Sequence, residues 1–185
     1  MKGKDIAIST NTIIEYATDK ILEKYGLSPD DVNKVAVPQI PARLEMLQSG
    51  KIDAATLPDP LATVAIKNGA KVIESTDRLG INPGVLLFSD QALEQKENEI
   101  KAFYRAYNKA VEYLKQNDKS SYIDIVIEKA SFPEDVRDTI VLPEYTKAGL
   151  PSKEDFDGVM EWLVKKGLIG KAFSYEELVD GRFVE

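Results

Sequence analysis

The sequence predicts an α/β fold in which a parallel sheet is followed by a mainly helical region. Short apolar segments alternate with segments of helical spacing between residues 4 and 75. Glycine or proline stands at most junctions between them, and helical patterns dominate from residue 90 onward. Short helices between short apolar strands imply right-handed crossovers, and these produce a mainly parallel sheet.

The chain begins with an expected strand, Asp5–Ile8, that leads through the polar turn Ser9–Thr12 into a helix over Ile13–Tyr25. Thr12 and Glu15 have the spacing of a capping box, in which each side chain accepts the backbone N–H of the other residue. The first turn of a helix has unpaired N–H groups and the positive end of the helix dipole. The turn therefore fits a polar or anionic ligand site, while plain helix capping is the commoner reason for such a turn.

Two more strand–helix pairs and a last strand complete this half. Their expected bounds are Lys34–Val37, Ala42–Gln48, Asp53–Leu57, Leu61–Lys67 and Lys71–Glu74. In parallel sheets the ligand lies outside the carboxyl ends of the strands. The loops Ser9–Thr12, Pro38–Pro41 and Leu57–Pro60 all follow strands, so we expect them to share one edge of the sheet.

The second half contains a linker, one apolar strand and several helices. We expect the linker over Ser75–Gly84 and the strand, buried on both faces, over Gly84–Phe88. The expected helices are Ile100–Gln116, Tyr122–Lys129, Pro133–Thr139, one from Ser152 to Lys166, and one or two turns within Tyr175–Glu185. Because one strand cannot make a sheet, Gly84–Phe88 must join the first sheet, or its partner strands must lie on another chain or on a missing segment.

The composition excludes several functions. The net charge is −7, from 24 Lys and Arg against 31 Asp and Glu, which argues against nucleic-acid binding. The sequence has no Cys and no His, so thiol chemistry, His-based triads and most zinc sites are excluded. We expect no metal, no cofactor and no membrane-spanning run, and we find no Gly-rich phosphate loop.

The candidate ligand-binding residues come from the three loops and the helices that follow them. They are Ser9, Thr10, Asn11, Thr12, Tyr16, Gln39, Arg43 and Asp59. Hydroxyls, an amide, a carboxylate and a guanidinium suit hydrogen bonding to a small polar molecule, and they contain no nucleophile–base pair.

Each candidate also has a structural reading. Arg43 can clamp an anion or form a surface salt bridge with Glu45 or Asp59. Asp59 can bind a ligand or stabilise a helix N-terminus, and Gln39 can be a solvated loop residue. Tyr16, one turn inside the first helix, can present its ring to a ligand.

Three stretches resemble the extracytoplasmic solute-binding proteins of ABC importers. Lys2–Thr12 resembles a Lys-Gly-Lys strand with a Ser/Thr turn, and Gly50–Pro60 resembles a Gly-x-Ile-Asp-Ala strand with a Pro-acid-Pro loop. Ile100–Val111 resembles the long helix that follows the return strand, and residues 44–63 have the pattern of the same group. The nearest branch contains binders of taurine, alkanesulfonates, nitrate and thiamine pyrimidines.

The resemblance implies a type II periplasmic-binding fold. Residues 1–78 would be the inserted second lobe, and 79–185 the returning part of a first lobe that lacks its opening strands. Family members have an export signal and a first-lobe βαβαβ stretch before the Lys-Gly-Lys strand, and this sequence has neither. The chain is then expected to be truncated, or to complete its sheet as a homodimer.

The expected function is capture of a small polar or anionic solute between two lobes, outside the cytoplasm, for delivery to an ABC permease without catalysis. Two alternatives stay open: an enzyme on the same fold, similar to those of menaquinone synthesis, and a ligand-binding module of a sensory receptor. A pyrimidine synthase that consumes its own histidine is excluded, since the chain has none.

Overall fold

Three parallel strands form the sheet of the computed structural model, which describes residues 1–81 and 84–184. Strands β1 (Asp5–Ile8), β2 (Asn33–Ala36) and β3 (Ala54–Ala55) lie in the order β2-β1-β3. Both strand pairs are parallel, with Ile6 opposite Lys34 on one side and opposite Ala54 on the other. The predicted α/β fold with a parallel sheet is confirmed, and its first strand in sequence is its central strand.

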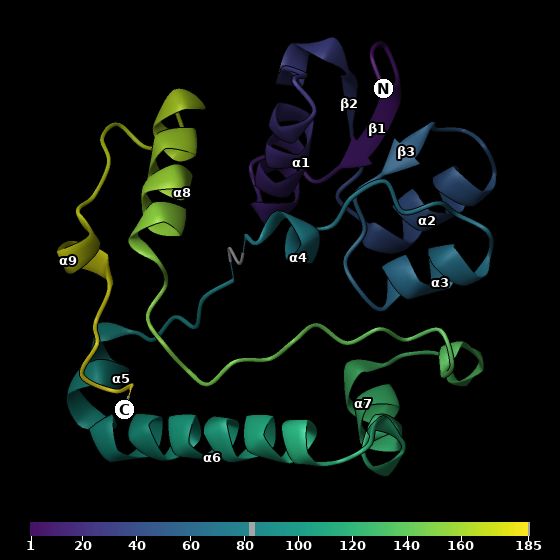
Figure 1. Cartoon of the computed structure of the whole chain (residues 1–185). Coiled ribbons are helices and arrows are strands. Elements are labelled where there is room, and N and C mark those ends of the chain that lie inside the picture. Colours follow the sequence, from purple (N-terminus) through teal and green to yellow (C-terminus); the bar gives the residue numbers. More distant parts are fainter. Residues whose placement is uncertain (82–83, 185) are drawn as a thin grey trace. The chain divides into compact units, whose positions relative to one another are not determined.

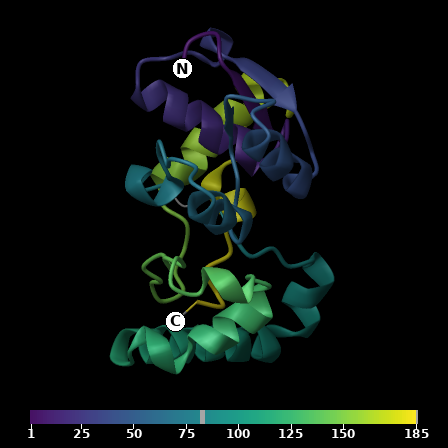
Figure 2. The same cartoon turned by 90° about the vertical axis from the view of Figure 1, so that its right-hand side faces the viewer.

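Helices lie on both sides of this sheet. Figure 1 shows α1 on one side of the strands and α2 and α3 on the other, and Figure 2 shows α1 (purple) lying beside the strands. The helical elements of this part are α1 (Ile13–Lys24), η1 (Pro29–Asp31), α2 (Ile40–Gln48), α3 (Leu61–Lys67) and α4 (Thr76–Leu79). Alternating strands and helices therefore place the ends of all three strands at one edge, where α1, α2 and α3 begin.

The core of this part lies between β1 and α1. Ile6 and Ile8 of β1 pack with Leu22 of α1 and with Val32, and all four are buried. Full burial of one such side chain contributes about 1.5–3 kcal/mol. The core therefore fixes α1 against the central strand, and it fixes the turn that joins them.

The chain divides into two compact units, residues 1–81 with 125–142, and residues 82–124 with 143–185. The later segment of the first unit contains most of helix α7 (Ile123–Ala130) and the turn η3 (Glu134–Val136). Inside this unit the Lys67 ammonium forms an ion pair with the Asp135 carboxylate. The expected lobe boundary after residue 78 stays a prediction.

The second unit is helical in its described residues. Its elements are α5 (Asp90–Gln95), α6 (Glu97–Gln116), η2 (Lys119–Ser121), α8 (Lys153–Lys165) and α9 (Tyr175–Leu178). The Tyr107 hydroxyl of α6 donates to the Thr146 carbonyl at 3.1 Å. The Phe156 and Tyr175 rings meet edge-on, with centroids 5.3 Å apart. A side chain of α6 thus anchors the segment before α8, and a side chain of α8 packs against α9.

Two predicted strands are wrong. Lys71–Glu74 and Gly84–Phe88 form no strand, and Ile73 is 53 % exposed and Leu87 86 % exposed. The expected burial of Gly84–Phe88 on both faces is therefore also wrong. An apolar run becomes a strand only when a neighbouring strand takes up its backbone N–H and C=O groups, and none of the described strands does so here.

Smaller differences concern the ends of elements. The expected helix over Pro133–Thr139 is reduced to the turn η3, and α6 begins three residues before its predicted start. The predicted linker Ser75–Gly84 contains the short helix α4, and its residues 82 and 83 lie outside the described residues. None of the helices in 1–81 and 84–184 is long and apolar enough to cross a membrane.

Candidate functional site

Three strand ends meet at one edge of the sheet. Ser9 follows β1, Pro38 lies two residues after β2, and Thr56 follows β3. The Ser9 hydroxyl donates to the Pro38 carbonyl at 3.4 Å, and the Thr56 N–H donates to the Ala7 carbonyl at 3.1 Å. The three strand ends, from which the predicted loops start, therefore lie together at one edge of the sheet.

Arg43, on the first turns of α2, ties these ends together. Its Nη1 donates to the Thr56 carbonyl at 2.6 Å, and its Nη2 donates to the Ser9 hydroxyl at 3.1 Å. The residue is fully buried, so it forms neither of the two surface salt bridges that the sequence also allowed. Burial lowers the pKa of the guanidinium.

The guanidinium is not fully satisfied. Its Nε is buried and has no hydrogen-bond partner among the described residues. Its other partners are a carbonyl and a hydroxyl, which carry no charge to balance it. A buried cation of this kind raises the electrostatic potential at the edge above it and favours an anion there.

The turn between β1 and α1 is held by its own side chains. The Thr12 hydroxyl accepts the Ile14 N–H at 3.2 Å and donates to the Ser9 carbonyl at 2.9 Å. Asn11 adopts the left-handed conformation with φ 58°, which asparagine tolerates better than most residues.

The predicted capping box is wrong in its partners. The Thr12 side chain caps the Ile14 N–H rather than the Glu15 N–H. The Glu15 carboxylate reaches past Thr12 and accepts the Asn11 N–H at 2.7 Å. The left-handed Asn11 turns its N–H toward the helix, which explains the change of partner. The backbone N–H groups of Thr12 and Ile13 have no partner in the described parts of the chain.

A buried ion cluster lies beneath this turn. The Lys34 ammonium of β2 is 2.9 Å from a Glu15 carboxylate oxygen and 2.5 Å from an Asp19 carboxylate oxygen. Glu15 and Asp19 are each 2 % exposed. Burial by itself lowers the pKa of Lys34, but hydrogen bonds with Asp19 and Glu15 outweigh burial and raise it.

The other predicted site residues differ in accessibility. Thr10, Asn11, Thr12 and Gln39 are exposed at the edge, and Gln39 is the N-cap residue of α2 without a capping bond from its side chain. Tyr16 is 5 % exposed, so its ring is covered rather than presented at the edge. Their role in ligand binding stays a prediction.

Asp59 caps helix α3. Its carboxylate accepts the N–H of Thr63 at 3.0 Å and the Thr63 hydroxyl at 2.7 Å. The structural reading of this residue is therefore correct, while a second role in ligand binding stays a prediction. Since one carboxylate oxygen takes both bonds, the other keeps its accepting capacity.

Sequence reasoning missed the buried partners of the site. The Thr18 and Thr56 hydroxyls share a hydrogen bond of 2.7 Å and join α1 to the end of β3. Glu15 and Asp19 lie four residues apart, hence on one helical face, and this spacing is the signal that could have indicated their common partner. Lys34 carries no such signal, because its neighbours come from another element.

The site offers hydrogen-bond donors rather than reactive groups. Free backbone N–H groups at the start of α1, exposed hydroxyls and amides, and a buried guanidinium suit the binding of a small anion. Among the described residues no three His, Cys, Asp or Glu side chains are grouped to hold a metal ion. A hollow of about 230 Å³ in the second unit, beside Tyr104, Arg105 and Phe183, contains none of the predicted site residues.

Comparison with solved structures identifies the fold. The periplasmic aliphatic sulphonate binding protein SsuA from Escherichia coli matches all of this chain with a TM-score of 0.76 and 16 % identity. The alkanesulfonate-binding protein SsuA from Xanthomonas axonopodis pv. citri bound to MOPS matches 99 % of it, with a TM-score of 0.70 and 19 % identity. A ligand-binding component of an ABC-type import system from Staphylococcus aureus, with zinc bound, matches 97 %, with a TM-score of 0.71 and 17 % identity. The chain therefore has the periplasmic-binding-protein fold.

The match leaves part of each solved structure uncovered. The chain spans 59 % of the Escherichia coli protein, 61 % of the Xanthomonas protein and 62 % of the Staphylococcus protein. No curated protein matches the sequence. A family model described as the NMT1-like family matches residues 3–127, more than half of the chain. The chain therefore belongs to the NMT1-like family.

Proposed function

We propose that this chain binds a small polar or anionic solute at the carboxyl edge of its sheet, as part of an extracytoplasmic solute-binding protein of an ABC importer. Membership of the NMT1-like family and the fold support this assignment. The solved structures with this fold include sulfonate-binding proteins and a ligand-binding component of an ABC-type import system. No chemical step is proposed, since the site supplies donors for a ligand rather than a group that reacts with one.

The observation that carries the proposal is the buried guanidinium of Arg43 beneath three converging strand ends. It fixes Ser9 and the Thr56 carbonyl, while its Nε stays without a partner in the described structure. The unpaired N–H groups of Thr12 and Ile13 lie at the positive end of the α1 dipole. A preformed set of donors costs little ordering on binding, so it favours affinity for a small anion.

Two partners belong to the proposal. An ABC permease would receive the solute from the extracytoplasmic side. A second copy of the chain would pair with the apolar segment Gly84–Phe88, whose side chains at 85, 86 and 87 are each more than half exposed. Backbone pairing between copies would satisfy the N–H and C=O groups of this segment.

A thermal-shift screen tests the binding function. The probes are methanesulfonate, taurine, acetate, inorganic phosphate and neutral glycerol, each at millimolar concentration. A ligand that binds only the folded state adds about 2.7 kcal/mol of stability at a hundredfold excess over its dissociation constant. We expect at least one anion to raise the unfolding midpoint, and calorimetry to confirm its binding.

A pair of variants assigns the binding to this edge. Gln39→Ala should reduce the shift produced by the anion without changing the midpoint of the free protein, because the Gln39 side chain is exposed. Gln91→Ala, an exposed glutamine of α5, should leave the shift unchanged. Absence of a shift with every probe, together with flat calorimetric titrations, would contradict the proposed function.

A further inference from the structure

The ion cluster beneath the turn connects three elements. Lys34 comes from β2, Glu15 and Asp19 come from α1, and Asn11 lies in the turn itself. One Glu15 oxygen receives the Lys34 ammonium at 2.9 Å, and the other receives the Asn11 N–H at 2.7 Å. A continuous path therefore runs from an edge strand of the sheet, through one carboxylate, to the proposed ligand turn.

Burial makes this path sensitive to the loss of any member. The side chains of Glu15 and Asp19 are each 3 % exposed, and that of Lys34 is 14 % exposed. Two buried carboxylates share one ammonium, so removal of the ammonium takes away an ion pair from each of them. Loss of one partner of a buried ion pair is strongly destabilising, because the charge that stays behind loses its compensation by that partner.

The cluster also bears on the charge that a ligand meets. Glu15 accepts a backbone N–H directly before the first turn of α1, where an incoming anion is expected. Unneutralised, this carboxylate would repel an anion. Lys34 offsets this charge through its ion pair with Glu15 at 2.9 Å.

We propose that Lys34 is a positioning residue, which holds the Glu15 carboxylate on the Asn11 N–H and so fixes the left-handed turn that binds the solute. The inference rests on the proposed function for its ligand, while its structural half stands without one. It gives Lys34, a strand residue outside the three loops, control over both the shape and the charge of the site.

Amide hydrogen exchange measured by NMR tests the structural half without a ligand. In the full chain with Lys34→Met, we expect the Asn11 N–H to exchange at least tenfold faster than in the wild type. The Val37 N–H, which bonds to the Ile8 carbonyl at 2.8 Å, should keep its protection. Lys34→Arg, which retains the charge and donors, should restore slow exchange at Asn11.

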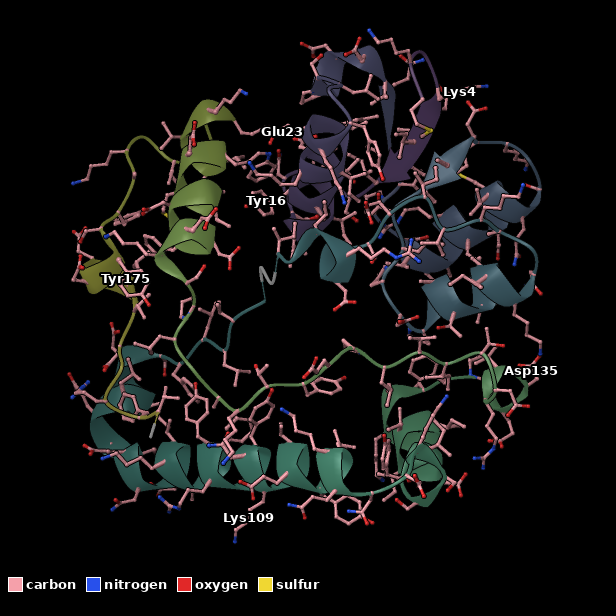
Figure 3. All side chains as sticks on the ribbon, viewed as in Figure 1. Lys4, Tyr16, Glu23, Lys109, Asp135 and Tyr175 are labelled. Atoms are coloured by element: carbon pink, nitrogen blue, oxygen red, sulfur yellow. The ribbon has the colours of Figure 1, made fainter. Side chains whose placement is uncertain are left out.

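A matched control lies at the other end of β1. Lys4 forms an exposed ion pair with Asp53 at 2.8 Å, and Figure 3 labels it near the N-terminus, at the opposite end of the strand from the turn. Lys4→Met should leave the exchange of the Asn11 N–H unchanged. If Lys34→Met does not fold, the double variant Lys34→Met with Asp19→Asn lowers the buried negative charge by one, and it should still expose the Asn11 N–H.

The outcomes separate the inference from the proposed function. Equal acceleration at Asn11 and Val37 in Lys34→Met would mean that Lys34 only stabilises the unit, and would overturn the inference. Unchanged exchange at Asn11 would overturn it as well. In a parallel titration with methanesulfonate, Lys34→Met should weaken binding about tenfold and Lys34→Arg should not. If the wild type does not bind methanesulfonate, only methanesulfonate is ruled out as a ligand. The exchange result still decides whether Lys34 positions the turn.

Discussion

At the scale of single residues, buried charges decide the character of this edge. Arg43, Lys34, Glu15 and Asp19 are two cations and two anions, and their charges sum to zero. Arg43 bonds to a carbonyl and a hydroxyl, while Lys34 bonds to both carboxylates. The compensation is therefore uneven in space, with an unbalanced cation under the three strand ends. This unevenness is what favours an anion over a cation at the site.

Glu74 gives the first unit a defined acid sensitivity. The Lys24 ammonium, the Ser75 N–H and the Tyr25 hydroxyl lower the pKa of this carboxyl from 4.5 to about 2. A carboxyl with a lowered folded pKa stabilises the fold above its unfolded pKa, and the contribution is lost as the pH falls from 4.5 toward 2. We expect Glu74→Gln to lose less stability than the wild type between pH 5 and pH 2, measured by urea denaturation at each pH.

The matched control for this pH series is Glu23→Gln. Glu23 pairs with Lys20 on the surface of α1 at 2.9 Å, and it is labelled in Figure 3. An exposed i,i+3 pair contributes only a few tenths of a kcal/mol. The Glu23→Gln protein should therefore follow the wild type over the same pH range. Parallel behaviour of Glu74→Gln and the wild type would contradict the role given to Glu74.

At the scale of elements, the sequence predicted what local patterns control. The Asp5–Ile8 strand, the bounds of α3 and the start of α1 agree with the structure. Gly26 and Thr12 set the ends of α1 through capping, which is local. The meeting of the three strand ends at one edge follows from the strand–helix alternation, so it was predictable as well.

The absence of strands at 71–74 and 84–88 was not predictable, because a strand depends on a distant partner. Val72 and Ile73 have high strand propensity, yet they are 46 % and 53 % exposed and unpaired in the sheet. The buried contacts of the site could not be predicted for the same reason. The distance from Lys34 to Glu15 depends on the β2–α1 packing, and no spacing along the chain encodes that packing.

Helix α3 tests the dual assignment of Asp59. Asp59→Ala should lower the free energy of unfolding by about 1 kcal/mol, since it removes the acceptor for the Thr63 N–H. Asp59→Asn keeps an oxygen at that position and should cost only a few tenths of a kcal/mol. Urea denaturation measures both variants.

The same pair separates capping from ligand binding. If the carboxylate charge also contacts the solute, Asp59→Asn changes the dissociation constant of the anion or cation that binds while stability is retained. Equal affinity in Asp59→Asn and the wild type would assign Asp59 to the cap alone. A stable Asp59→Ala protein would instead contradict the capping role.

At the scale of the whole molecule, the exposed apolar side chains of Gly84–Phe88 indicate a surface that can pack against a partner. Val85, Leu86 and Leu87 are 57 %, 55 % and 86 % exposed, and the segment contains no charged residue. The solved structures with this fold are longer, since the chain spans 59–62 % of the three described above. Exposed uncharged segments of this length are prone to pair with another strand.

Light scattering coupled to size-exclusion chromatography tests association through this segment. We expect the wild type to elute with the mass of a dimer, and Leu87→Lys to elute as a monomer because the charge opposes strand pairing. Leu178→Lys, at an exposed leucine of α9, should remain dimeric. A monomeric wild type at tens of micromolar would rule out the second copy as the partner of Gly84–Phe88.

The order of the strands has a consequence for the assembly of the sheet. Every strand pair in the described sheet includes β1, which pairs with β2 at residues 33–36 and with β3 at residues 54 and 55. One side of β1 therefore has no neighbouring strand until the chain as far as residue 55 has folded. A deletion of residues 5–8 would abolish both strand pairs at once, and it would take apart the edge at which the three strands end.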